Sequence, residues 1–197
     1  STLRYHLLSN PSARAVGVDL LPERAIRRVL GRELPSDRRA DCLRRFRYVR
    51  YDVRHITYAI LDKMTRTILD VPLKNVDHAH AGFPCTTTSK ASTQTPASRG
   101  FVPHRWPDGR ARSARAKADD ELLDAIVNLF TAMQRASPDM LISIEQPENE
   151  VFLTLPPARR LLEAGWAVLR GSHCRAASSL LDQQWQMRGD HPQKHSL

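Results

Sequence analysis

The chain has 197 residues, of which 41% are hydrophobic and 26% are charged, as is usual for a soluble globular protein of one domain. No apolar run approaches the roughly 20 residues that a transmembrane helix needs, and no signal peptide is recognisable, so we expect no membrane partner. Thirty Lys and Arg against 21 Asp and Glu give a net charge of +9. This charge favours a polyanionic partner, and nucleic acid more than anionic lipid. The alternative is that the arginines merely form a solvated face.

Apolar patterns in the first half predict helices that alternate with short strands. A helix ends at residue 8, and the compact run Ala15-Val16-Gly17-Val18-Asp19 predicts a buried strand. Pro22 opens a helix that stops at Gly31. Further strands are expected over 47–51 and 76–81, with a helix over 56–69 between them.

The second half begins with a segment of a different kind. Residues 86–118 show no period and are rich in Thr, Ser, Pro, Gly and Arg, which predicts a long basic loop. Asp119 then starts the clearest helix, with an apolar stripe made by Leu122, Leu123, Ile126, Leu129, Phe130 and Met133. Strands are expected over 141–144 and 166–169, a helix over 156–164, and a poorly defined polar tail over 171–197.

This alternation predicts an α/β fold with a mainly parallel sheet and helices on both faces, in a single domain over 1–197. Asp19, Asp52 and Glu145 each stand at the end of a strand, and Cys85 follows another. Because ligands of open α/β sheets bind at the carboxyl ends of strands, we expect these side chains to converge on one edge.

Two of these residues have chemically useful surroundings. Cys85 follows Gly82-Phe83-Pro84, a tight turn that would present its thiol outward, where a lowered pKa would make it a nucleophile. Glu145 ends the apolar run Leu141-Ile142-Ser143-Ile144, where partial desolvation suits a proton donor. Taken singly, Cys85 is better interpreted as a buried inert thiol, because free Cys packs like a small hydrophobic residue. Glu145 could equally be a capping or salt-bridged carboxylate.

Together, Gly82-Phe83-Pro84-Cys85 and Glu145-Gln146-Pro147 resemble the Gly-x-Pro-Cys turn and the Glu-Asn-Val or Glu-Asn-Pro segment of the cytosine-5 DNA methyltransferase family. The resemblance covers most of the chain and implies a Rossmann-like sheet. It implies that the thiolate of Cys85 adds to carbon 6 of cytosine while Glu145 acts as the acid at ring nitrogen 3. Carbon 5 then takes a methyl group from S-adenosylmethionine. The target base must be flipped out of the duplex to reach Cys85.

The same resemblance assigns further residues. It places S-adenosylmethionine against Asp19-Leu20, where the acid holds the ribose, and against Asp52-Val53, which faces the adenine; Gly82 and Pro84 complete the cofactor-binding set. Gln186-Met187-Arg188 falls near the family's Gln-x-Arg-x-Arg segment, which makes Arg188 a further catalytic candidate. The basic loop is expected to contact DNA phosphates through Arg99, Arg105, Arg110, Arg112, Arg115 and Lys117. RNA is also a possible substrate.

The chain departs from the family pattern in several places. Gln146 replaces the usual Asn, Asp190 replaces the second Arg, and the loop after Cys85 is long. The family's first strand and its Phe-x-Gly-x-Gly loop are missing, and we expect them upstream of Ser1 in a longer protein. Without them the strands over 15–19 and 76–81 lose a shared neighbour, and we expect the 197-residue chain to bind S-adenosylmethionine weakly or not at all.

Three alternatives stay open. The chain could be a catalytically inactive methyltransferase-like module that binds nucleic acid. His78, His80 and Cys85 could hold a metal, although zinc normally needs a fourth ligand and we predict no metal site. A hydrolase using Cys and one of the eight His is also open, whereas a phosphatase would need an Arg where Ala91 stands. The odd set Cys42, Cys85 and Cys174 indicates free thiols and an intracellular protein, nuclear in a eukaryote and otherwise cytoplasmic.

Overall fold

In the computed structural model, the backbone is described for residues 2–84, 87–88, 104–146, 150–168, 171–172 and 195–196. The chain divides into two compact units. Unit 1 comprises Ser1–Ala79 with Leu129–Leu141, and unit 2 comprises His80–Asn128 with Ile142–Leu197. Whether they work as the single catalytic domain that the sequence predicts stays a prediction.

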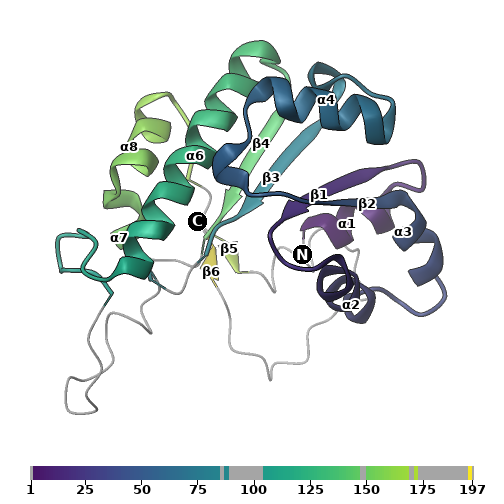
Figure 1. The fold of residues 1–197 in the computed structure, drawn as a ribbon, viewed down its shortest axis with the longest axis horizontal. Coiled ribbons are helices and arrows are strands. Elements are labelled where there is room, and N and C mark those ends of the chain that lie inside the picture. Colours follow the sequence, from purple (N-terminus) through teal and green to yellow (C-terminus); the bar gives the residue numbers. More distant parts are fainter. Residues whose placement is uncertain are drawn as a thin grey trace. The chain divides into compact units, whose positions relative to one another are not determined.

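Unit 1 begins with helix α1 (Thr2–Ser9) and is organised around two parallel strands, β1 (Ala15–Asp19) and β2 (Phe46–Arg50), which lie side by side in Figure 1. They pair in register from Ala15 opposite Phe46 to Asp19 opposite Arg50. The remaining elements of the unit are α2 (Glu23–Glu33), α3 (Arg39–Arg45), η1 (Val53–His55), α4 (Tyr58–Leu69) and η2 (Leu73–Asn75).

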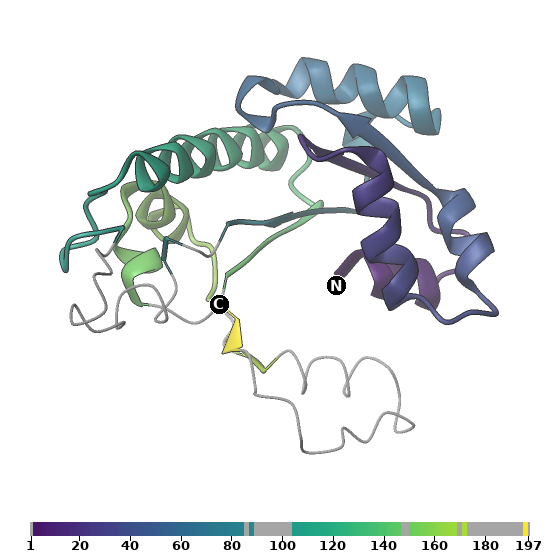
Figure 2. The same cartoon turned by 60° about the horizontal axis from the view of Figure 1, so that its bottom comes forward.

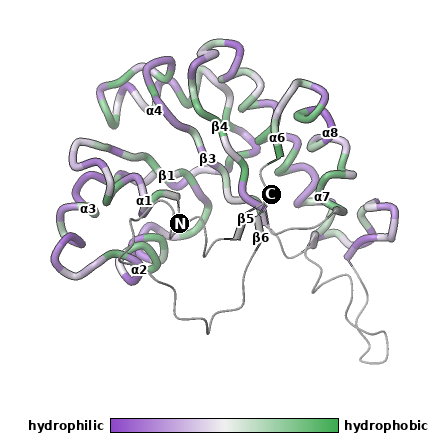
Figure 3. The backbone as a smooth tube through the Cα atoms, turned by 180° about the vertical axis from the view of Figure 1, so that it is seen from behind, coloured by the Kyte–Doolittle hydropathy of each residue, from purple (hydrophilic) through white to green (hydrophobic). Residues whose placement is uncertain are grey.

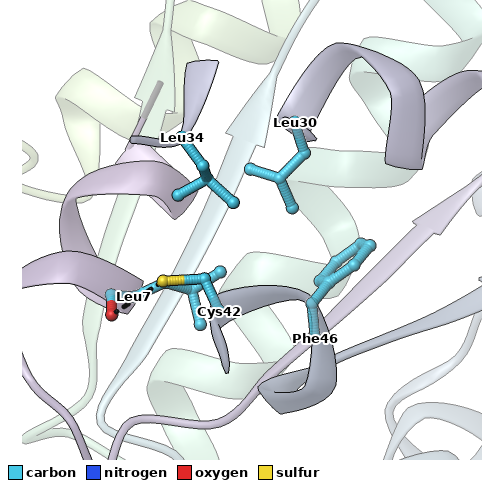
Figure 4. Packing of buried hydrophobic residues seen from close by; sticks show 5 residues of the cluster. All are labelled: Leu7, Leu30, Leu34, Cys42 and Phe46. Atoms are coloured by element: carbon cyan, nitrogen blue, oxygen red, sulfur yellow. Dashed lines mark hydrogen bonds between the residues drawn. The ribbon is translucent and has the colours of Figure 1, made fainter. Parts of the chain in front are cut away.

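The core of unit 1 joins the helices to these strands. Leu7, Leu30, Leu34, Cys42 and Phe46 form one buried cluster, with the thiol of Cys42 against the carbonyl of Leu7 (Figure 4). A Cβ on Gly17 would lie 2.8 Å from the ring of Phe46, so only glycine lets β1 pass this ring. The expected helix end, the first two strands and the helix up to residue 69 are confirmed within about two residues.

The side chain of Arg45 binds backbone carbonyl groups next to this core. Its guanidinium donates to the carbonyl oxygens of Leu7, Asn10 and Ala13 at 2.6, 3.0 and 2.9 Å. Leu7 lies in the last turn of α1, where carbonyl groups lack helical partners, so Arg45 satisfies one of them. Helix α3, which the sequence analysis missed, is thereby attached to α1.

Two strands and one long helix continue the chain: β3 (His78–Gly82), α6 (Ala114–Ala136) and β4 (Leu141–Glu145). β3 and β4 pair with each other. Leu141 donates its N–H to the carbonyl of Asp77, and Phe83 donates to that of Glu145, so the two strands run in the same direction. The predicted apolar stripe of α6 is confirmed: Leu123, Ile126, Leu129, Phe130 and Met133 are buried.

Unit 2 also contains α7 (Glu150–Thr154), α8 (Pro156–Glu163) and the short antiparallel pair β5 (Gly171–Ser172) and β6 (His195–Ser196). Arg160 of α8 forms an ion pair with Asp124 of α6 at 2.5 Å, and α8 lies beside α6 in Figures 1 and 2. The tube in Figure 3 alternates hydrophobic and hydrophilic stretches along the helices, as amphipathic helices do.

The α/β class and the parallel pairing of neighbouring strands are confirmed. The described strands form three separate two-stranded sheets, however, and not one continuous sheet, so β1 and β3 do not pair directly. The strand expected over 166–169 is wrong for its described part, because Trp166–Val168 have no regular structure. The basic loop is also shorter than expected, since α6 begins at Ala114.

Candidate functional site

The turn after β3 is fixed on both sides of Cys85, which itself lies outside the described residues. Gln146 is 1% exposed; its amide nitrogen donates to the carbonyl of Phe83 at 2.9 Å, and its amide oxygen accepts from the hydroxyl of Thr88 at 3.2 Å. One buried amide thus joins the chain before Cys85 to the chain after it. Gln146, noted in the sequence only as a departure from Asn, is therefore a central part of this turn.

Two further contacts anchor the same turn in unit 2. The hydroxyl of Thr87 donates to the carboxylate of Asp119 at 2.5 Å, and both side chains are buried. The ring of Phe83 is 5% exposed and packs against Phe152 at a centroid distance of 5.9 Å. Sequence reasoning missed Thr87, Thr88 and Asp119, since no local pattern links residues 30 or more positions apart.

Glu145 lies at the same carboxyl edge of the β3–β4 pair. Its side chain is 33% exposed, and Oε2 lies 3.8 Å from Nε2 of His80. The other ring nitrogen of His80, Nδ1, lies 2.9 Å from the hydroxyl of Ser143. Ser143 and Glu145 are two residues apart on β4 and so share a face, which places a hydroxyl, an imidazole and a carboxylate in one row.

The backbone beside this row is open at Gly82. A Cβ placed on Gly82 would meet nothing within 4 Å, and Pro84 is half-buried. A ligand could therefore approach the main chain closely at Gly82, as the resemblance requires of a cofactor-binding residue.

Unit 1 has its own polar edge, at the carboxyl ends of β1 and β2. Asp19 Oδ1 accepts from the N–H of Leu21 at 2.9 Å, and its carbonyl accepts from the N–H of Tyr51 and the hydroxyl of Tyr48. The Tyr48 hydroxyl also donates to the carbonyl of Leu21. Burial, reinforced by the carboxylate of Asp19, raises the pKa of Tyr48. The turn after β1 is thus held by a protonated phenol.

The surroundings of Asp19 fit the nucleoside part of S-adenosylmethionine. Leu20 and Leu21 are 52% and 53% exposed directly after this acid. An acid that can accept from ribose hydroxyls beside apolar surface for a base is the combination that a nucleoside needs.

Asp52 fits the adenine of S-adenosylmethionine less well than Asp19 fits the ribose. It directly precedes Val53, the first residue of the 3-10 turn η1. Both oxygens of Asp52 accept from Arg54: Oδ1 from N and Nε at 3.0 Å, and Oδ2 from Nη2 at 2.6 Å. The bonds from Arg54 lower the pKa of Asp52 to about 2. In this geometry the carboxylate is occupied by its own chain and does not face a ligand freely.

The basic residues expected to contact phosphate differ in exposure. Arg110, Arg112, Arg115 and Lys117 are exposed. Arg105 is not: its side chain is 0% exposed and pairs with Asp120 at 2.6 Å. We therefore remove Arg105 from the phosphate-contacting set, because its guanidinium is used inside unit 2. Arg99 and the catalytic candidate Arg188 lie outside the described residues.

The described residues contain no group of three or more His, Cys, Asp and Glu that could hold a metal ion. His78 Nδ1 instead lies 2.7 Å from Nε2 of His6. Within the same described part, no helix has the length and apolar character to cross a bilayer. The chain was compared with protein families, curated proteins and solved structures, and none of them matches it.

Proposed function

We propose that the chain is a cytosine-5 methyltransferase-like module that acts on DNA through Cys85 and Glu145. The observation that supports it best is the set of buried hydrogen bonds that Gln146 and Asp119 make with residues on either side of Cys85, namely Phe83, Thr87 and Thr88. A nucleophile must be held in a defined place, and buried hydrogen bonds on both sides of a thiol achieve this.

In the proposed reaction the thiolate of Cys85 forms a bond to carbon 6 of a flipped cytosine. Glu145 protonates ring nitrogen 3, which absorbs the charge that develops there, and His80 and Ser143 hold this carboxyl group in place. Once carbon 5 carries the methyl group, it loses its proton to water, the carbon 6–sulfur bond breaks to release the Cys85 thiolate, and the proton on nitrogen 3 returns to Glu145, which restores the aromatic ring. When bound, S-adenosylmethionine supplies the methyl group; Asp19 and Leu20 would hold its nucleoside part.

Covalent trapping tests this proposal. A DNA duplex with 5-fluorocytosine has no proton to lose at carbon 5, so the Cys85 adduct should accumulate and survive denaturing electrophoresis. We expect Cys85→Ser to abolish the adduct and methyl transfer, since a hydroxyl is a far weaker nucleophile, while Cys42→Ser, a change at a buried thiol of unit 1, leaves both. The assay should use the longest available version of the protein. An undiminished adduct in Cys85→Ser would overturn the proposal.

The second candidate is a module of the same kind that binds nucleic acid without catalysis. The engagement of Asp52 by Arg54 favours it, because an adenine contact at Asp52 would have to compete with a neighbouring guanidinium. Calorimetry with S-adenosylmethionine separates the two candidates. Binding that strengthens in Arg54→Ala would support a cofactor site at Asp52. Absence of binding in both proteins, measured in the longest available version of the chain, would support the inactive module.

A further inference from the structure

Residues 104–113 form a small hairpin in unit 2. Arg105 and Ala111 make an antiparallel bridge, and at the tip the N–H of Gly109 donates to the carbonyl of Trp106 at 2.9 Å. Trp106 in turn donates its N–H to the carbonyl of Arg110 at 2.9 Å. The segment, which we call the 104–113 hairpin, therefore has a defined backbone.

The inner side of this hairpin is firmly attached to the helices of unit 2. The buried guanidinium of Arg105 binds Asp120 of α6 at 2.6 Å and the carbonyl of Gly109 at 3.0 Å. Gly109 has φ of +85°, and a Cβ there would lie 2.7 Å from the hydroxyl of Thr154 in α7. The tip is thus pressed against α7 in a conformation that glycine adopts readily.

The outer side presents an aromatic ring among cations. Trp106 is 46% exposed, and the guanidinium carbon of Arg112 lies 4.5 Å from its ring centroid. Residues 104–117 include one exposed carboxylate, that of Asp108, and four exposed cations: Arg110, Arg112, Arg115 and Lys117. A cation over an indole is favourable in itself, but it does not require the ring to face solvent.

We propose that Trp106 and Arg112 form a stacking platform for an unpaired nucleobase, while the neighbouring cations bind the phosphates beside it. The inference rests on the proposed function, since base flipping creates unpaired nucleotides in the DNA substrate. An exposed aromatic ring beside a guanidinium is the arrangement by which proteins bind single strands, because every base has a π-face and every nucleotide a phosphate. The rigid attachment means that little order is lost on binding.

The test compares two strands of equal charge with the full chain: a 12-nucleotide single strand and an abasic strand with the same number of phosphates. We expect Trp106→Ala to weaken binding of the base-containing strand about fivefold to a hundredfold. Binding of the abasic strand should be unchanged. Trp106→Phe, which keeps an aromatic ring, should retain most of the affinity. Equal loss on both strands, or no loss on either, would overturn the platform.

Two controls keep the result interpretable. Arg110→Ala, next to the platform, should weaken binding of both strands alike, because it removes charge and leaves the ring. Arg24→Ala, a change at an exposed arginine of α2, should bind both strands as the unchanged chain does. Because the test measures strand binding and not the Cys85 adduct, the platform and methyl transfer can fail separately. If Trp106→Ala alters only the self-association of the chain, seen by light scattering, the ring belongs to an interface between copies and the inference is wrong.

Discussion

The side-chain amide of Gln146 donates to the carbonyl oxygen of Phe83 at 2.9 Å, two residues before Cys85. The same amide accepts from Thr88, three residues after Cys85. Both contacts are buried, so neither group can turn to water if the amide is lost.

Gln146→Ala should therefore destabilise the folded chain by about 1–3 kcal/mol, the usual penalty for leaving a buried polar group without its partner. It should also reduce the trapped Cys85 adduct, because the turn is no longer held. Gln134→Ala is the matched control: Gln134 also donates to a backbone carbonyl, that of Pro138 at 2.7 Å, but at an exposed position. Urea denaturation measures both variants, and equal effects would show that burial of the Gln146 amide is unimportant.

Arg105→Ala should be among the most destabilising changes at any arginine of unit 2. It would leave Asp120 without its cation and the carbonyl of Gly109 without its donor, and breaking a buried pair typically costs about 3–5 kcal/mol. Because the Asp120 side chain is still 35% exposed, we expect the lower end of that range. Arg110→Ala, with a side chain 78% exposed, should cost less than about 0.5 kcal/mol. Chemical denaturation decides; similar midpoints for the two variants would contradict the structural role of Arg105.

The contrast between Arg105 and Arg110 shows which features of the site could not be predicted from the sequence. Nothing local distinguishes Arg105 from Arg110, since the partner of Arg105 lies 15 residues away on α6. Strands and amphipathic helices were predictable because burial imposes a period on neighbouring residues. The pairing of strands into separate sheets was not, because it depends on contacts between distant segments.

Two errors have local causes. The sequence predicts that α6 starts at Asp119, but the helix begins five residues earlier, because the Ser113 hydroxyl accepts the N–H of Ala116 at 3.1 Å and caps it. The expected strand at 166–169 fails because Trp166 donates its N–H back to the carbonyl of Leu161, and Gly165, with φ of +89°, ends α8. That backbone donor is thus used by the helix end and not by a sheet.

Asp52 should make unit 1 sensitive to acid. Its folded pKa is about 2, below the value of about 3.9 expected for the unfolded chain. A depressed carboxyl pKa contributes stability that is present above about pH 4 and is lost as the pH falls towards 2. Arg54→Ala should remove this contribution, so the two proteins should differ in stability at pH 6 and converge near pH 2. Arg24→Ala, a change at an exposed arginine of α2, should leave the acid profile unchanged. Urea unfolding at several pH values is the measurement; an unaltered profile for Arg54→Ala would refute the assignment.

The exposed arginines that follow the buried Arg105 should bind DNA through charge, and Arg112 also through stacking, but without recognising particular base sequences. Replacing Arg110, Arg112 and Arg115 by Ala should weaken DNA binding to a similar degree on all sequences, because phosphates are the same everywhere. Each lost phosphate contact should flatten the slope of log affinity against log salt by about one unit, since one fewer counterion is released. Arg105 is excluded from this set because its guanidinium is buried on Asp120.

Replacing the exposed Arg24 and Arg28 of α2 provides a control of equal chemistry in unit 1, and it should leave the slope unchanged. Fluorescence anisotropy between 50 and about 200 mM salt measures these slopes. If the α2 control flattens the slope as much as the Arg110, Arg112 and Arg115 changes do, binding reflects net charge alone, and the basic segment has no special part in it.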